Sequence, residues 1–110
     1  MYEQNISTTE FLNSSFILMR KKVQRLKDIN LKQKRGKIPL PLLKEKLENT
    51  SKILEALRIL LDMLDYNNPD SNEIAEVYVI IGQRLSLANV DLDNDMYQNV
   101  IDILDGFLEP

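Results

Sequence analysis

The chain has 110 residues, of which 44% are hydrophobic and 28% are charged, and its formal net charge is −3. These values predict one soluble globular domain and exclude a disordered chain. The longest apolar runs fall far short of the roughly 20 residues that span a bilayer, and the polar N-terminus does not resemble a signal peptide, so we expect a cytoplasmic protein. Cysteine and histidine are both absent, which excludes disulfides, thiolate chemistry and the commonest metal ligand.

The charges are distributed unevenly along the chain. Between Arg20 and Lys37 there are nine basic residues and one acid, whereas the chain from Ile38 onward has five basic and fourteen acidic residues. A basic segment therefore precedes an acidic body.

The first predicted helix follows a polar N-terminal arm, residues 1–8. It begins at Thr9 and frays after Asp28, before a basic linker at about 30–41 in which one glycine and two prolines interrupt the pattern. Its apolar residues alternate at spacings of three and four, as on one face of a helix. They are Leu12, Phe16, Met19, Val23 and Leu26.

The second predicted helix has the strongest periodicity. A seven-residue repeat predicts that one face packs against another helix, and further apolar residues widen this face, so more than one neighbour is expected. The repeat consists of Leu43, Leu47, Thr50, Leu54, Leu57, Leu61 and Leu64. The helix stops near Asn67, Asn68 and Pro69.

The third and fourth predicted helices are separated by a short turn. Asp70 and Glu73 form an aspartate version of the capping box at the start of the third helix, and Asn89 is the expected left-handed residue at its end. Asp93 is expected to cap the fourth helix. Four helices with short connections predict an all-α, antiparallel four-helix bundle formed by residues 9–110.

A calcium site is the alternative interpretation of the acids around this turn. Asp91, Asp93, Asp95 and Asp102 occupy positions 1, 3, 5 and 12 of an EF-hand loop. Position 6, which is normally glycine, is Met96, and the second half of the segment has helical periodicity. We therefore expect helix capping and no metal site. Because no histidine is available as a base and the glycines are isolated, we also expect no enzyme activity and no cofactor.

Two binding hypotheses remain open from composition and pattern. The basic segment 20–37 would suit a nucleic-acid-associated regulator, although it lacks interleaved aromatic residues and the acidic body would repel a polyanion. The apolar surplus of the second and fourth helices would suit a groove for an amphipathic partner segment. A helical subunit of another assembly is the third possibility.

The stretch from Arg84 to Asp93 resembles a known family. Its Arg-Leu-x-x-Ala-Asn-x-x-x-Asp pattern is similar to the signature of flagellar export chaperones of the FliS type, and the resemblance extends over residues 53–108. The matching residues are Arg84, Leu85, Ala88, Asn89 and Asp93, with Val100 and Leu104 at apolar positions downstream. The resemblance implies a cytoplasmic helical bundle that holds the C-terminal segment of flagellin and stops it polymerising before export.

The first helix departs from the family, which usually continues Leu-Tyr-Asp-Gly where this chain has Arg20 to Val23. The departure predicts a divergent member, either a chaperone or a co-chaperone that docks on the flagellin chaperone. We expect no nucleic-acid or membrane partner. An inter-helix groove is expected to bind the partner, and Tyr2 is expected to fold back over the empty groove. The predicted partner-binding residues are Tyr2, Ile74, Tyr78, Ile81, Leu85, Asn89 and Leu104.

Overall fold

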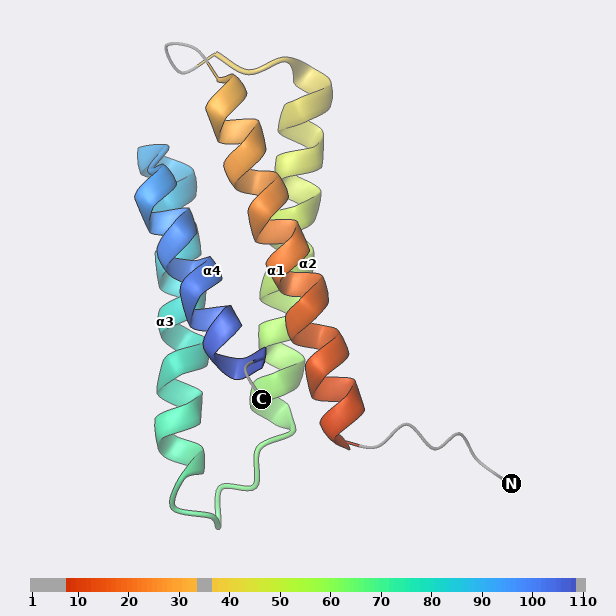
Figure 1. Ribbon diagram of the computed structural model, residues 1–110, viewed down its shortest axis with the longest axis vertical. Coiled ribbons are helices and arrows are strands. Elements are labelled where there is room, and N and C mark those ends of the chain that lie inside the picture. Colours follow the sequence, from red (N-terminus) through yellow and green to blue (C-terminus); the bar gives the residue numbers. More distant parts are fainter. Residues whose placement is uncertain (1–7, 34–36, 109–110) are drawn as a thin grey trace, which may run out of the picture.

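The computed structural model describes residues 8–33 and 37–108, which form four helices. Consecutive helices run in opposite directions, and each packs mainly against its two neighbours around the bundle (Figure 1). The predicted antiparallel four-helix bundle is therefore confirmed. The helices are α1 (Thr8–Lys32), α2 (Leu40–Asp62), α3 (Ser71–Asp91) and α4 (Asn94–Leu108).

We call the end with the α1–α2 and α3–α4 connections the upper end of the bundle, and the end with the α2–α3 connection the lower end (Figure 1). Residues 1–7, which include most of the predicted N-terminal arm, lie outside the described residues, and Thr8 already belongs to α1. No helix in the described part of the chain is long and apolar enough to cross a membrane.

The core consists of one apolar face from each helix. Side chains three and four residues apart lie on the same face of a helix, and in each helix this face points toward the bundle axis. Each large apolar side chain that is fully buried contributes about 1.5–3 kcal/mol of hydrophobic stabilisation. The buried apolar residues of this cluster are Phe16, Met19, Val23, Leu26, Ile53, Leu57, Leu60, Tyr78, Ile81, Leu85, Ala88, Tyr97, Val100, Ile101 and Leu104.

The first helix is longer than the sequence predicts. It continues past Asp28 to Lys32 because Ile29 and Asn30 are buried, and tertiary packing of this kind overrides weak local propensity. The predicted linker 30–41 is correspondingly shortened. α2 begins at Leu40 after the N-cap Pro39; a proline at this position is tolerated because the first N–H groups of a helix have no intrahelical acceptor.

The start of α3 differs from the predicted capping box. Asp70 occupies the N-cap position, but its side chain makes no capping hydrogen bond. Its backbone N–H donates to Asn68 Oδ1 at 3.0 Å, so the acceptor that Glu73 was expected to provide is supplied by the preceding turn. Ser71 Oγ also donates to the carbonyl of Asp65. Hydrogen bonds with the α2–α3 connection therefore define the start of α3, and an Asp–Glu capping box does not.

The corner between α3 and α4 also corrects one prediction. The left-handed residue is Leu92, with φ 55°, whereas Asn89 remains helical. Asp93 accepts hydrogen bonds from the backbone N–H groups of Asp95 and Met96, at 2.9 and 3.1 Å. This is the geometry of an N-cap at the start of α4.

The lower half of the bundle is closed by aromatic rings. α4 is the shortest helix, and its C-terminal end stops above the lower ends of its neighbours (Figure 1). There Phe107 stacks on Phe16 with a centroid separation of 4.6 Å, and Tyr78 lies tilted 5.7 Å from Phe107. These rings seal the core where the fourth helix ends.

Candidate functional site

The predicted groove residues lie mostly in the core. Tyr78, Ile81, Leu85 and Leu104 are buried in the cluster, and Ile74 packs against it half-buried. They are shielded from a partner in the closed bundle, so a partner-binding role for them stays a prediction that requires the bundle to open. Tyr2 lies outside the described residues.

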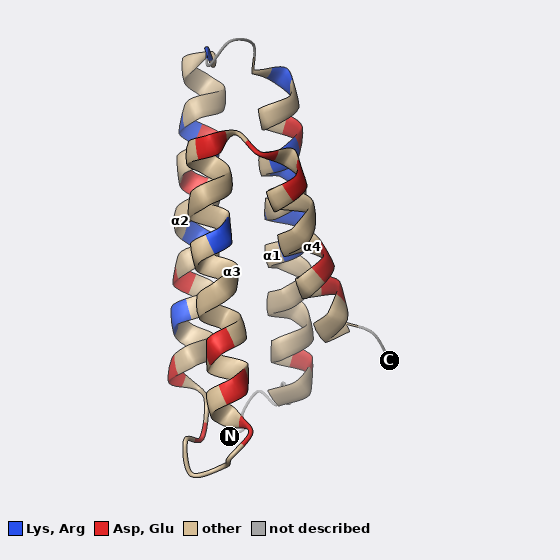
Figure 2. Ribbon diagram, turned by 90° about the vertical axis from the view of Figure 1, so that its left-hand side faces the viewer, with Lys and Arg blue, Asp and Glu red and all other residues tan. Residues whose placement is uncertain are grey.

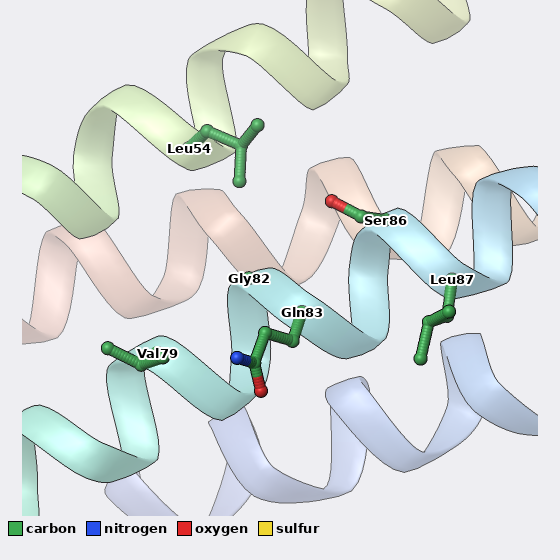
Figure 3. A pocket seen from close by; sticks show the side chains of 6 residues that line it. All are labelled: Leu54, Val79, Gly82, Gln83, Ser86 and Leu87. Carbon is green, nitrogen blue, oxygen red and sulfur yellow. The ribbon is translucent and has the colours of Figure 1, made fainter.

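An exposed apolar groove lies instead on the outer side of the α2–α3 pair. We call it the α2–α3 groove; it is shallow and open. In Figure 3, Leu54 reaches from α2 toward α3, and the other five lining residues lie along successive turns of α3. The lining residues are Leu54, Val79, Gly82, Gln83, Ser86 and Leu87.

Gly82 forms the floor of this groove. A Cβ atom at this position would lie 3.6 Å from Cδ2 of Leu54 and 3.7 Å from Cδ1 of Leu57, so the two helices approach closely here. Around this floor, Val79, Leu54 and Leu87 are all exposed. An exposed aliphatic rim over a small floor residue is a surface that can accept apolar side chains from outside.

Apolar surface continues along both helices beyond the groove. Below it, a second depression shares Val79 and extends to Ala75 and Ile80 on α3. Above it, Leu40 and Leu47 are exposed on α2, and Val90 is exposed on α3.

The heptad repeat of α2 was the sequence signal for this surface. The core-facing residues of α2 are Ile53, Leu57 and Leu60, whereas Leu47 and Leu54 of the repeat are exposed. The repeat therefore follows the edge of α2 that faces α3, and only part of it enters the core. Sequence reasoning assigned the whole repeat to packing because core and edge leucines have the same spacing.

Asn89 belongs to a polar network at the upper end of the α2–α3 pair. Its Nδ2 donates to Thr50 Oγ1 at 2.9 Å, and its Oδ1 accepts a hydrogen bond from the hydroxyl of Tyr97. Burial raises the pKa of Tyr97 to about 12, so this hydroxyl remains a donor at neutral pH. Asn89 therefore joins α2, α3 and α4 and has an internal structural role.

Lys46 is the buried cation of this network. Its Nζ lies 3.3 Å from the carbonyl oxygen of Asn89, in the last turns of α3. A cation at this position satisfies a carbonyl near the helix C-terminus and interacts favourably with the helix dipole. Burial lowers the pKa of Lys46. Asn30 supports the same corner from α1, because its Nδ2 donates to the carbonyl of Leu92 at 2.9 Å.

The basic segment 20–37 is partly neutralised within the bundle. Arg20 pairs with Asp105 of α4, and Arg25 pairs with Glu45 of α2. The hydrogen bond from Arg25 lowers the pKa of Glu45. Lys27 donates to Gln98 at 2.7 Å. These pairs favour a structural role for Arg20, Arg25 and Lys27 over a continuous phosphate-binding surface.

The acids of the α3–α4 corner do not enclose an ion-binding loop. Asn94–Leu108 is helical, so Asp102 lies in the third turn of α4 and cannot close a loop that starts at Asp91. Within residues 8–33 and 37–108, no three carboxylates are grouped so that they could hold a metal ion.

Comparison with known proteins adds no assignment. No protein-family model matches the chain, and no curated protein matches it significantly.

Proposed function

We propose that this protein is a non-enzymatic, cytoplasmic export chaperone or co-chaperone of the FliS type. In this proposal the α2–α3 groove binds an amphipathic helical segment, either from the C-terminus of flagellin or from the flagellin chaperone, and prevents premature assembly. The observation that carries the proposal is the exposed aliphatic surface around Gly82, which belongs to a bundle whose core is already complete without it.

A helix lying in a groove is a recurring mode of peptide recognition, in which apolar anchors at i, i+3, i+4 and i+7 contact a hydrophobic surface. Here exposed aliphatic side chains of α2 and α3 surround Gly82, so an incoming helix has a shallow depression to occupy. Because the partner contacts would add to surface that is now solvated, binding requires no disruption of the core.

The residues that resemble the chaperone signature have structural roles that agree with this proposal. Leu85 and Ala88 are buried, Asn89 is in the polar network, and Asp93 caps α4. Arg84 donates a hydrogen bond to Asn99 of α4. The signature therefore shapes the corner that holds α3 in place beside α2.

The cations that depart from the family lie away from this groove. Arg20 pairs with Asp105 of α4, and the residues that line the groove come from α2 and α3 and not from α1. Their presence therefore leaves the proposed binding surface unchanged. It distinguishes the α1 surface of this chain, which supports a divergent member of the family.

The test is a binding measurement with purified flagellin C-terminal segment and with purified flagellin chaperone. Leu87→Asp places a charge in the groove. We expect it to raise the dissociation constant at least tenfold, which corresponds to a loss of about 1.4 kcal/mol of binding free energy. Leu87 is 51% exposed, so the substitution should leave the fold intact. Circular dichroism checks this point.

Leu18→Asp is the matched control, because Leu18 is 53% exposed on α1, outside the groove. We expect its affinity to stay within twofold of the wild-type value. Equal losses for both variants would contradict the groove as the binding site. Absence of binding to either partner by the wild-type protein would refute the proposed function.

A further inference from the structure

The end of the α2–α3 pair below the groove has acidic residues and no basic residue. Between Ile59 and Gln83 the sequence has no lysine or arginine. It has five acids there, all of them exposed, and Figure 2 shows acidic residues over the lower ends of α2 and α3 and their connection. They are Asp62, Asp65, Asp70, Glu73 and Glu76.

Glu76 places this charge directly beside the apolar surface. It lines the depression below the groove together with Asn72, Ala75 and Ile80, and Val79 belongs to both. A partner that fills the groove and extends downward must therefore pass this carboxylate. Arg58, one helical turn before Asp62 on α2, is the last cation before the acidic region.

The upper end of the same surface has charges of both signs. Lys44 and Glu48 line a depression with the exposed leucines of α2, and Asp91 ends α3. The electrostatic potential along the groove therefore changes from mixed at the upper end to negative at the lower end.

We infer that the groove accepts its partner helix in one direction, with basic residues in the N-terminal half of that helix lying at the acidic lower end. This inference rests on the proposed function of the groove. The partner helix would run parallel to α3 and antiparallel to α2.

Two physical effects favour this direction. Lysine or arginine residues of the partner would lie near the five acids, and the N-terminus of any α-helix carries about half a positive charge from its dipole. In the opposite direction, the negative helix C-terminus would face the same carboxylates. The exposed position of the acids makes both effects sensitive to salt, because the Debye length falls from about 10 Å at 0.1 M to about 3 Å at 1 M.

The direction is tested with two synthetic amphipathic peptides. The surface from Asn72 to Leu87 follows about 22 Å of α3 at 1.5 Å per residue, so peptides of about 16 residues suffice. Both peptides have the same composition and the same leucine positions. One carries its lysines in the N-terminal half and its glutamates in the C-terminal half, and the other has the reverse order. Circular dichroism measures the helicity of each free peptide, and the measured affinities are corrected for any difference in helicity between the two peptides.

We expect the peptide with N-terminal lysines to bind at least fivefold more tightly at 0.05 M salt, and the ratio to approach one at 1 M salt. Glu76→Lys should reduce the low-salt ratio. Asp102→Lys is the matched control, since it makes the same charge change on an exposed site of α4; we expect it to keep the wild-type ratio.

The failures of the two proposals are distinguishable. Equal binding of both peptides, or a preference that Glu76→Lys leaves unchanged, would overturn the inferred direction while the groove remains a binding site. Binding of neither peptide would overturn the inference together with the groove. Concentration-dependent self-association that Glu76→Lys abolishes would assign the acidic end to a second copy of the chain and overturn the inference as well.

Discussion

The α2–α3 pair has two regions with opposite chemistry. At the upper end, Lys46 and Thr50 of α2 are joined to Asn89 of α3 by hydrogen bonds. Below this network, Leu54 lies beside Gly82, close enough to touch a Cβ atom added there, and the surrounding aliphatic side chains are exposed.

The difference shows how one helix pair can be both fixed and available. Hydrogen bonds in a buried setting have strict geometry, so the upper region determines how α2 and α3 are aligned. Apolar contact is non-directional, so the lower region can exchange water for partner side chains without changing that alignment. We therefore expect substitutions in the upper region to change stability, and substitutions in the groove to change binding.

The largest expected effect concerns Tyr97 at alkaline pH. Its pKa is raised by burial to about 12 in the folded protein, from the ordinary tyrosine value of 10.0. Its contribution to the free energy of unfolding is complete below pH 10 and is lost as the pH rises through about 12, because the unfolded chain releases the proton first. Two pKa units correspond to roughly 3 kcal/mol.

Urea denaturation of the wild-type protein and Tyr97→Phe at pH 9 and pH 12 measures this effect. We expect the wild-type protein to lose stability relative to the variant between these values. A constant difference between the two proteins across this range would contradict the buried environment of the hydroxyl.

Asn89→Ala is expected to lower the free energy of unfolding by about 2 kcal/mol at neutral pH. The substitution leaves the buried hydroxyl of Tyr97 without its acceptor, and an unsatisfied buried polar group costs about 1–3 kcal/mol. Asn99→Ala is the control, because Asn99 accepts a hydrogen bond from Arg84 at the α3–α4 surface. If chemical denaturation gave similar losses of unfolding free energy for both variants, Asn89 would be no more important for stability than a surface residue.

Much of the fold follows from periodicity, whereas the location of the groove does not. The apolar residues whose spacing predicted the helices lie in the core, as at Val23, Ile81 and Leu104. The α2 repeat and the core residues of α2 are equally apolar, so only the placement of α3 decides that Leu54 lies at the exposed edge. Sequence spacing defines a face of one helix but does not specify which neighbour covers it.

Local propensity was also insufficient at the polar corner. Asparagine readily adopts the left-handed conformation, which is why Asn89 was expected to end the third helix. In the structure its side chain is held by Thr50 and Tyr97, residues distant in sequence, and Leu92 adopts the left-handed conformation. Such long-range hydrogen bonds have no signature within a short window of sequence.

The smallest expected effects come from substitutions of the two helical glycines that the structure describes. Gly82→Ala and Gly106→Ala should each raise the free energy of unfolding by about 0.5–1 kcal/mol, because glycine is unfavourable inside a helix. The added methyl group at Gly82 makes ordinary contact with Leu54, and nothing lies within 4 Å of it at Gly106.

Only Gly82→Ala raises the floor of the groove, so we expect a weaker affinity for the partner from this variant alone. Thermal unfolding and a binding titration on both variants measure the two quantities. A matching loss of affinity in Gly106→Ala would show that the change in binding does not come from the groove.

The most direct measurement is an amide NMR titration of the isotope-labelled protein with the flagellin C-terminal segment and, separately, with the flagellin chaperone. We predict that one of these partners shifts the signals of the groove, above all Leu54, Gly82 and Leu87, while those of Asn89 and Tyr97 stay nearly unchanged. Shifts confined to α1 and α4, or no shifts with either partner, would contradict the α2–α3 groove as the binding site.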